Sequence, residues 1–287
     1  MPRELRDCQV TIIGLGLMGG SLAGALRGQC RSVVGVARRT EVIEVALAQD
    51  LIDWGTTDVA KAVREAHIVV LATPVRIIAR QLAEIGPLVP EGCLLMDLGS
   101  TKAHIVAEMA RLPGHVQPLG GHPMCGKETS GIETAEPALY QGCTFILTPL
   151  PRTSDAALAL GRELVKATGA HPLVLEAERQ DFLVGTMSHL PYLLACALVA
   201  TADATTSADP AAWKIVAGGF RDTSRVAGSE VTMMLDILMT NREEVLKAVD
   251  TFQAQLGALA GLLEAGDEDG LRAALSTIRE TRLEMFP

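Results

Sequence analysis

The sequence predicts an α/β domain followed by an all-helical domain. Through the first half of the chain, short apolar runs rich in β-branched residues alternate with helical patterns, which is typical of β-α-β units and a parallel sheet. A glycine-rich hexapeptide follows the first of these runs. The strand pattern ends near residue 175, and helical periodicity follows it. We therefore expect two domains, residues 1–175 and residues 176–287.

Runs with the length and composition of buried strands occur throughout the first domain. They are residues 10–14, 32–37, 68–72, 94–97, 144–148 and 172–175. Helical patterns lie between them, at residues 41–49, 75–85, 102–110 and 156–168. This order predicts a parallel sheet built from β-α-β units.

The helical half contains an uncharged segment, residues 182–202, that is long enough to raise the question of a membrane span. It is interrupted by Gly185, Ser188, His189 and Pro191. These interruptions favour a helix buried in the protein core or between subunits. Glycines at positions 218, 219 and 228 break the later helical pattern, and an amphipathic run begins near residue 243.

Composition limits the partners and the compartment. A chain of 287 residues with 48% hydrophobic content can bury a large core, and its formal charge of -9 provides no basic surface for nucleic acid or an anionic membrane. The six cysteines form no C-x-x-C pair, as expected of reduced core thiols. The charged N-terminus has no signal-peptide pattern. We expect a cytoplasmic protein with a small-molecule ligand and with no nucleic-acid or membrane partner.

The glycine-rich hexapeptide follows a predicted strand and opens a helix. It reads Gly14-Leu15-Gly16-Leu17-Met18-Gly19. Gly14 permits a tight turn, Gly16 lets a pyrophosphate approach the backbone, and Gly19 lets helix and strand pack closely. The N-terminus of the helix, at Leu17 and Met18, then receives the phosphates. A glycine-rich turn without a ligand is the alternative, but the strand-turn-helix context favours a Rossmann-type dinucleotide-binding domain.

The cofactor preference is read from the end of the second strand. NAD-binding domains usually place an acidic residue there to hold the ribose, whereas this chain has Arg38-Arg39-Thr40. A guanidinium pairs with a 2′-phosphate, so we expect NADP, with NAD less favoured. The two arginines could instead form a solvated turn. Thr73-Pro74 ends the third strand, where the chain should pass the nicotinamide ribose.

The motif Asp97-Leu98-Gly99-Ser100-Thr101-Lys102 follows another strand, at the carboxyl edge of the sheet where ligands bind in doubly wound folds. Ser100 could exchange a hydrogen bond with a ligand there. It precedes a helical pattern, so it could also be an N-cap residue. The two roles are compatible, because a cap occupies only one lone pair of the hydroxyl.

A histidine is the strongest catalytic candidate. His122 lies in Gly120-Gly121-His122-Pro123-Met124-Cys125-Gly126, and the glycines and proline predict a loop at a sheet edge. The pKa of imidazole, about 6.5, allows it to take a proton from an alcohol while hydride leaves the same carbon. A surface-loop histidine is the alternative.

The helical half adds a second histidine and two arginines. His189 lies in Ser188-His189-Leu190-Pro191, within an otherwise apolar helix, where a structural core histidine is the commoner outcome. Arg221 and Arg225 lie in Phe220-Arg221-Asp222-Thr223-Ser224-Arg225. Arg225 could bind a substrate carboxylate through both arms of its guanidinium, or form a structural ion pair with a carboxylate such as Asp222.

In order and spacing, these motifs resemble the prephenate/arogenate dehydrogenase family, and the resemblance covers nearly the whole chain. It implies a helical domain that forms a homodimer, with the active site in the cleft between the two domains. His122 would accept the proton of the ring C4 hydroxyl, and Ser100 would bond that hydroxyl and His122. Arg225, with Arg221 nearby, would hold a substrate carboxylate.

The resemblance extends to the substrate pocket and the cofactor. His189 would line the pocket, and Arg38-Arg39-Thr40 is similar to the sequence of NADP-using members. Lys127 stands where the family usually has a small or hydroxylated residue. The implied reaction oxidises and decarboxylates prephenate or arogenate, giving 4-hydroxyphenylpyruvate or tyrosine, with hydride transfer to NADP. Because aromatisation of the ring drives this reaction, the protein needs only to orient the substrate and cofactor, accept one proton and bind the carboxylates.

No metal is expected, since the six histidines show no ligand spacing such as H-E-x-x-H. Two other functions stay open at this point. Another two-domain NAD(P)-dependent hydroxyacid dehydrogenase would share the glycine motif and the helical half but lack the His-Pro and Phe-Arg-Asp-Thr-Ser-Arg segments. A non-catalytic NADP sensor would bind the cofactor without turning over any cyclohexadienol.

Overall fold

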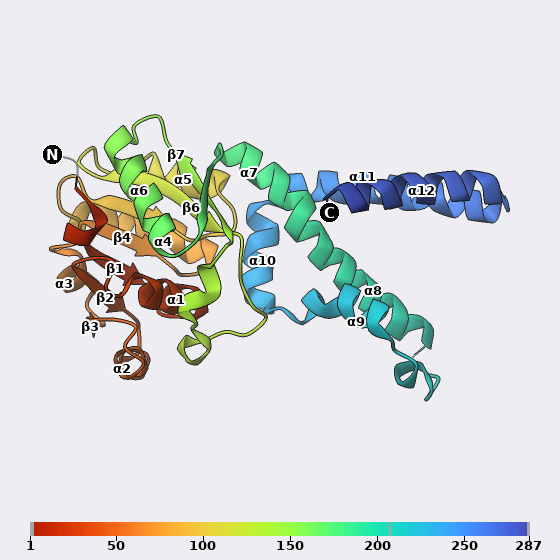
Figure 1. Ribbon diagram of the computed structural model, residues 1–287, viewed down its shortest axis with the longest axis horizontal. Coiled ribbons are helices and arrows are strands. Elements are labelled where there is room, and N and C mark those ends of the chain that lie inside the picture. Colours follow the sequence, from red (N-terminus) through yellow and green to blue (C-terminus); the bar gives the residue numbers. More distant parts are fainter. Residues whose placement is uncertain (1–2, 207, 286–287) are drawn as a thin grey trace. The chain divides into compact units, whose positions relative to one another are not determined.

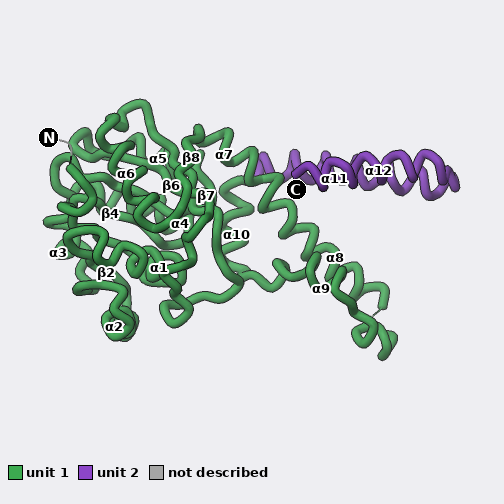
Figure 2. Tube along the Cα trace, viewed as in Figure 1, with its two compact units in different colours: residues 1–241 green, residues 242–287 purple. Residues whose placement is uncertain are grey.

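The computed structural model describes residues 3–206 and 208–285 (Figure 1). The chain divides into two compact units, residues 1–241 and residues 242–287 (Figure 2). The first unit contains the sheet and the helices through α10, and the second contains α11 and α12. The domain boundary near residue 175, where the strand pattern ends, stays a prediction.

The described residues form one eight-stranded sheet in the order β3-β2-β1-β4-β5-β6-β7-β8. Its strands are β1 (Gln9–Ile13), β2 (Ser32–Val36), β3 (Trp54–Thr56), β4 (Ile68–Leu71), β5 (Leu94–Asp97), β6 (Gln117–Pro123), β7 (Thr144–Pro149) and β8 (His171–Val174). Neighbouring strands pair in parallel, except that β6 and β7 are antiparallel. The order 3-2-1-4-5-6 is that of dinucleotide-binding Rossmann domains.

The prediction of a loop around His122 is wrong, because His122 lies within β6. This strand pairs with β5 on one side and β7 on the other, with His122 opposite Ile146. The glycines that suggested a loop permit close approach instead: a Cβ on Gly121 would collide with the carbonyl oxygen of Asp97 in β5. The short strand β3 was also not predicted, and the six predicted strands are present with boundaries shifted by at most one residue.

Helices cover both faces of the sheet. The helices are α1 (Leu17–Leu26), α2 (Thr40–Ala48) and α6 (Asp155–Ala167) on one face, and α3 (Val59–Val63), α4 (Val75–Ile85) and α5 (Ala103–Met109) on the other. Each face has its own apolar core, to which α1 contributes Leu22 and α4 contributes Ile78. Because both faces are buried, every residue of the central strands β1 and β4 is buried, and β4 is apolar throughout.

The remaining elements of the first unit are helical. They include α7 (Ala177–Val184), the π-helical turn η5 (Gly185–His189), α8 (Leu190–Thr206), α9 (Gly218–Ser224), the 3-10 turn η7 (Arg225–Gly228) and α10 (Val231–Thr240). Residues 177–206 form one helical stretch that by length and composition could cross a membrane, and a third of its most apolar window is buried within this single chain. α9 begins at the predicted break at Gly218, and η7 ends at Gly228.

The predicted amphipathic run from residue 243 is two helices, α11 (Arg242–Glu264) and α12 (Glu268–Met285), which form the second unit. Both expose large apolar side chains, among them Leu256, Leu263, Leu275 and Ile278. Short 3-10 helices in the first unit are η1 (Leu5–Asp7), η2 (Gly86–Leu88), η3 (Ile132–Thr134), η4 (Pro137–Tyr140) and η6 (Ala212–Lys214).

Candidate active site

The glycine motif forms the turn between β1 and α1, and each glycine has a distinct steric reason. Gly14 has φ +104°, and a Cβ there would lie 2.7 Å from the carbonyl oxygen of Ala72. A Cβ on Gly19 would collide with the carbonyl oxygen of Gly14, so α1 packs directly against the turn. Nothing lies within 4 Å of the Cβ position of Gly16, which leaves its backbone open to a ligand.

The N-terminus of α1 fits a dinucleotide pyrophosphate. α1 begins at Leu17, next to Met18, and no side chain caps its first turn. Free amide groups and the helix dipole at such an end favour an anion. Thr73 follows β4 and touches the glycine turn, since its methyl carbon lies 2.8 Å from the Cβ position of Gly14. Pro74 is exposed and begins α4 as its N-cap residue. These residues therefore fit a nicotinamide dinucleotide.

Arg38, Arg39 and Thr40 lie just beyond the carboxyl end of β2, and all three are exposed. Neither arginine forms an ion pair with a described residue. Their guanidinium groups are therefore available to a ligand at this edge of the sheet.

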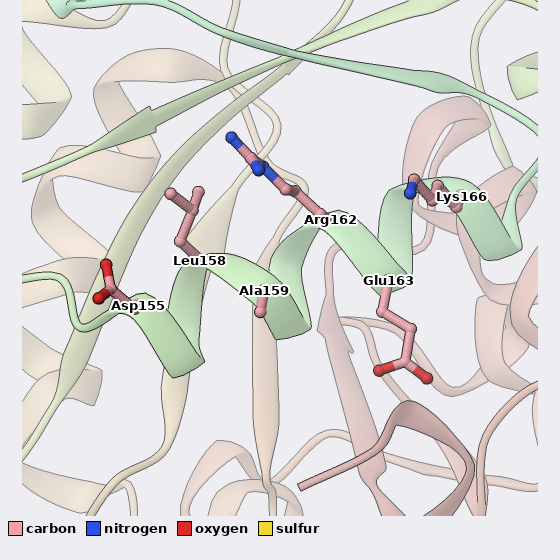
Figure 3. A pocket seen from close by; sticks show the side chains of 6 residues that line it. All are labelled: Asp155, Leu158, Ala159, Arg162, Glu163 and Lys166. Carbon is pink, nitrogen blue, oxygen red and sulfur yellow. The ribbon is translucent and has the colours of Figure 1, made fainter. Parts of the chain in front are cut away.

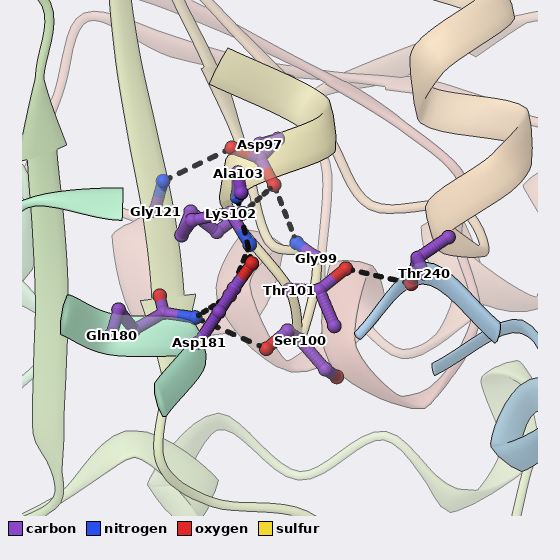
Figure 4. A network of polar contacts seen from close by, with 10 residues as sticks. All are labelled: Asp97, Gly99, Ser100, Thr101, Lys102, Ala103, Gly121, Gln180, Asp181 and Thr240. Atoms are coloured by element: carbon purple, nitrogen blue, oxygen red, sulfur yellow. Dashed lines mark hydrogen bonds and ion pairs between the residues drawn. The ribbon is translucent and has the colours of Figure 1, made fainter. Parts of the chain in front are cut away.

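A buried ion pair between Asp97 and Lys102 is the centre of the polar network in Figure 4. Both side chains are completely buried. Asp97 also accepts hydrogen bonds from the backbone amides of Gly99, at 2.7 Å, and Gly121, at 3.0 Å. Burial raises the pKa of Asp97 and lowers that of Lys102, and the opposite charge of each partner counteracts both shifts. The pair ties the turn at residues 97–102 to β6.

Asp181 from α7 caps the N-terminus of α5. Its two carboxylate oxygens accept from the backbone amides of Lys102, at 2.7 Å, and Ala103, at 2.8 Å. The N-cap role considered for Ser100 is therefore filled by a side chain from about 80 residues further along the chain. Ser100 is partly buried, and its carbonyl oxygen accepts from Gln180 Nε2 at 3.3 Å. Its hydroxyl makes no hydrogen bond with a described residue, so the expected bond to His122 is not formed.

His122 is held neutral in a buried position at the end of β6. Burial, and secondarily the positive charge of Lys102 and the neighbouring His189, lower the pKa of His122 to about 3. Its Nδ1 atom is fully buried, and no described residue offers this atom a well-aligned hydrogen bond. At neutral pH His122 is therefore an uncharged imidazole, and one of its ring nitrogens can accept a hydrogen bond.

His189 is the last residue of the π-helical turn, and burial lowers its pKa to about 4. Its Nδ1 lies 3.1 Å from Nδ2 of Asn241. Asn241 Nδ2 also donates to the carbonyl oxygen of Asp181, at 2.7 Å, so this atom must be the amide nitrogen. His189 Nδ1 is then the acceptor, and its proton is on Nε2. His189 can donate a hydrogen bond.

Arg225 and Arg221 are both exposed. Arg225 forms an ion pair with a carboxylate, as the alternative reading expected, but the partner is Glu128, six residues after His122, and not Asp222. Arg221 has no ion-pair partner among the described residues. Lys127 pairs with Glu136. The structure thus brings together His122, His189 and the Ser100 turn, and Arg225 joins the segment that follows β6.

Sequence reasoning missed Gln180 and Asp181. Both lie on the buried face of α7, together with Ala177 and Val184. The available signal was a pair of polar residues at positions i+3 and i+4 of a stripe whose other members are apolar, because such residues need internal partners.

A depression on the surface of α6 lies elsewhere (Figure 3). Its lining residues are Asp155, Leu158, Ala159, Arg162, Glu163 and Lys166. None of the predicted site residues lines it, so it is not the candidate site.

Comparison with known proteins agrees with this geometry. The family described as prephenate dehydrogenase, nucleotide-binding domain, matches residues 22–174, and the family described as prephenate dehydrogenase, dimerization domain, matches residues 176–277. A prephenate dehydrogenase of Bacillus subtilis is 31% identical over 285 residues, which cover 97% of this chain and 76% of that protein. A cyclohexadienyl dehydrogenase of Zymomonas mobilis subsp. mobilis is 32% identical over 281 residues, 96% of this chain and 95% of that protein.

A solved structure is similar over its full length. The prephenate dehydrogenase from A. aeolicus, in complex with hydroxyphenyl propionate and NAD+, has a TM-score of 0.91 and 32% sequence identity. The match covers 99% of this chain and 100% of that chain. The chain therefore belongs to the prephenate dehydrogenase family of NAD(P)-dependent oxidoreductases.

Proposed function

We propose that this chain oxidises and decarboxylates prephenate or arogenate, with His122 as the acceptor of the C4 hydroxyl proton. The observation that carries the assignment is the neutral, buried state of His122 at the end of β6. Nicotinamide dinucleotide, when bound, supplies the hydride acceptor. The loss of carbon dioxide restores an aromatic ring, so this chain has to orient the substrate, take one proton and hold carboxylate groups.

The two histidines divide the polar contacts of the substrate. A neutral His122 accepts from the hydroxyl as the C–H bond breaks. His189 presents an Nε2–H donor, which suits an acceptor oxygen of the substrate. Ser100 has a free hydroxyl at the carboxyl edge of the sheet, where it can form a hydrogen bond with the C4 hydroxyl that His122 contacts. Arg225, with Arg221 four residues before it, supplies the positive charge for a carboxylate.

The test of this function is turnover of both substrates with both cofactors. Wild-type protein should convert prephenate, arogenate or both, and His122→Asn should lower turnover by about 100-fold or more, the usual contribution of a positioned acid-base group. Cofactor affinity should be unchanged, because His122 contacts substrate. Near-normal turnover by His122→Asn would remove this residue from the mechanism.

NADP is the proposed preference over NAD. The supporting observation is that Arg38 and Arg39 are exposed, without ion-pair partners among the described residues, where an acidic residue would otherwise bind ribose. Replacing both by alanine should weaken NADP binding much more than NAD binding, because only NADP carries the 2′-phosphate. Arg31→Ala, an exposed arginine on the other end of β2, is the control. A silent double variant in a protein that prefers NAD would contradict the proposal.

We also propose that the chain forms a cytoplasmic homodimer through its helical half. Large apolar side chains are exposed there, including Phe182, Met187 and Trp213, and the matched family is described as a dimerization domain. A second copy would cover such surfaces. All six cysteines are free, as expected in a reducing compartment.

A further inference from the structure

Gln180 is a completely buried amide that belongs to the polar network of the site (Figure 4). It lies on the buried face of α7, beside Asp181. A buried polar side chain is costly unless its hydrogen bonds are satisfied, so each of its atoms should have a partner.

The contacts of the amide nitrogen determine how Gln180 is oriented. Nε2 donates to the carbonyl oxygen of Ser100, at 3.3 Å, and to Oδ1 of Asp181, at 3.0 Å. Both partners can only accept, so the nitrogen must face them and Oε1 must face the other way. Oε1 is buried and has no well-aligned partner among the described residues.

The matching atom is Nδ1 of His122, which is also buried and also without a well-aligned partner among the described residues. The two side chains are in contact, and their interaction raises the pKa of His122 against the larger lowering effect of burial. Oε1 is an acceptor, so the ring must offer it an N–H.

We propose that Gln180 accepts the Nδ1–H of His122 and thereby holds His122 in the tautomer whose Nε2 lone pair faces the substrate hydroxyl. Gln180 is a positioning residue, and the inference rests on the proposed role of His122 as proton acceptor. The bond that one ring nitrogen makes sets the protonation of the other. With the opposite tautomer, His122 would present an N–H to a hydroxyl that must donate, and proton transfer would fail.

A neutral amide suits this position better than a carboxylate. A carboxylate beside Nδ1 would stabilise the imidazolium and raise the pKa of His122. The ionisable groups that act on the ring are Lys102 and His189, and a positive charge on either one opposes protonation of His122. Asp97 is paired with Lys102. Gln180 therefore sets the tautomer and promotes protonation of His122 less than a carboxylate in its place would. Asn241 sets the opposite tautomer of His189, so the pair offers the substrate one acceptor and one donor.

Imidazole nitrogen NMR of the wild-type protein tests the tautomer directly and needs no turnover. His122 should be protonated at Nδ1 and His189 at Nε2, with signals assigned through His122→Asn and His189→Asn. An Nε2-protonated His122 would overturn the proposal. The expected tautomer in a protein that converts no cyclohexadienol would refute the proposed function and leave the Gln180 inference standing.

Two substitutions separate acceptor loss from packing loss. Gln180→Met keeps the approximate shape but has no acceptor. Gln180→Glu loses the amide donor to Ser100 and Asp181 but retains an acceptor oxygen, ionised or not. Turnover should fall about 10-fold or more in Gln180→Met, with His122 no longer in one tautomer and His189 unchanged. Gln180→Glu should keep the Nδ1–H tautomer and most of the turnover. Equal losses in both variants would show that Gln180 only bridges Ser100 and Asp181, and would overturn the proposal.

Discussion

At the scale of single residues, the candidate site contains three buried charged side chains, Asp97, Lys102 and Asp181. Asp97 and Lys102 neutralise each other, and Asp181 is stabilised by two backbone amides. Such a pair adds little net stability compared with apolar packing, but the loss of one partner leaves the other charge buried and unpaired. The physical role of these charges is therefore to hold the turn that carries Ser100 against β6 and α7.

Arg225 makes a residue-scale prediction. If it binds a substrate carboxylate, Arg225→Ala should raise KM for the substrate by about 10- to 100-fold, the loss of a charge-assisted hydrogen bond, with a smaller change in kcat. Arg225→Lys should recover only part, because an ammonium lacks the planar fork. Steady-state kinetics of the three proteins provides the measurement.

Glu128→Gln is the matched control for Arg225, because it breaks the observed ion pair while leaving the guanidinium free. Substrate binding by Arg225 predicts that KM in Glu128→Gln stays the same or falls. If Arg225 serves only that ion pair, both variants should lower the melting temperature alike and leave KM unchanged, and the carboxylate role would be wrong.

At the scale of elements, the π-helical turn η5 aligns the two parts of the long helical stretch. Two side chains that are eight residues apart in a regular α-helix point in directions about 80° apart. A π turn accommodates one extra residue, so the same two side chains are oriented as if they were seven residues apart, with directions that differ by only about 20°. Asp181 and His189 are eight apart, and both side chains are buried. The π turn thus returns His189 to the buried face that carries Gln180 and Asp181.

The elements that bury His122 and His189 make the free energy of unfolding depend on pH in the acid range. The folded-state pKa values of His122 and His189, about 3 and about 4, lie below the value of about 6.5 for an exposed histidine. The unfolded chain therefore binds more protons between these limits, and stability falls as pH drops from about 6.5 toward 4. Each histidine contributes at most about 1.4 kcal/mol per pH unit.

Chemical denaturation at pH 7 and pH 5 measures this effect. His122→Asn and His189→Asn should each lose less stability between the two pH values than wild type does. His104→Asn, which changes an exposed histidine on α5, should behave as wild type. If His122→Asn and His189→Asn lose as much stability as wild type between pH 7 and pH 5, the pH dependence originates in other groups.

At the scale of the whole molecule, the sheet unit has a buried core on both faces, whereas α11 and α12 expose apolar side chains along their lengths. A single chain leaves this surface in water, which is costly and unusual for a monomer. A second copy of the chain is the proposed cover.

The dimer is tested by the mass in solution, which should be twice the 30.3 kDa of one chain. Leu275→Asp together with Ile278→Asp, which are three residues apart on α12 and half exposed, should weaken association by placing charges in an apolar interface. Thr277→Asp, an exposed polar position between them, is the control. A monomeric wild-type protein at micromolar concentration would contradict the proposal.

The sequence by itself determined the features that depend on neighbouring residues. The glycine turn, the six apolar strands and the amphipathic helix α4 follow from backbone sterics and hydrophobic periodicity, which act over a few residues. The order of the motifs, and His122, His189 and Arg225 as candidate site residues, could also be inferred from the sequence. Local signals were misleading where distant residues determine the conformation. The glycines of β6 indicate a loop in the sequence, but pairing with β5 and β7 makes this segment a strand.

Tertiary structure alone decided which groups meet. Asp181 caps α5 in place of Ser100, Glu128 pairs with Arg225 in place of Asp222, and Gln180 lies against His122. These partners are 58 to 97 residues apart in the sequence, and local sequence patterns do not reveal which distant residues come into contact. Burial then set the histidine pKa values, because the cost of charge depends on the surrounding dielectric and not on the residue type.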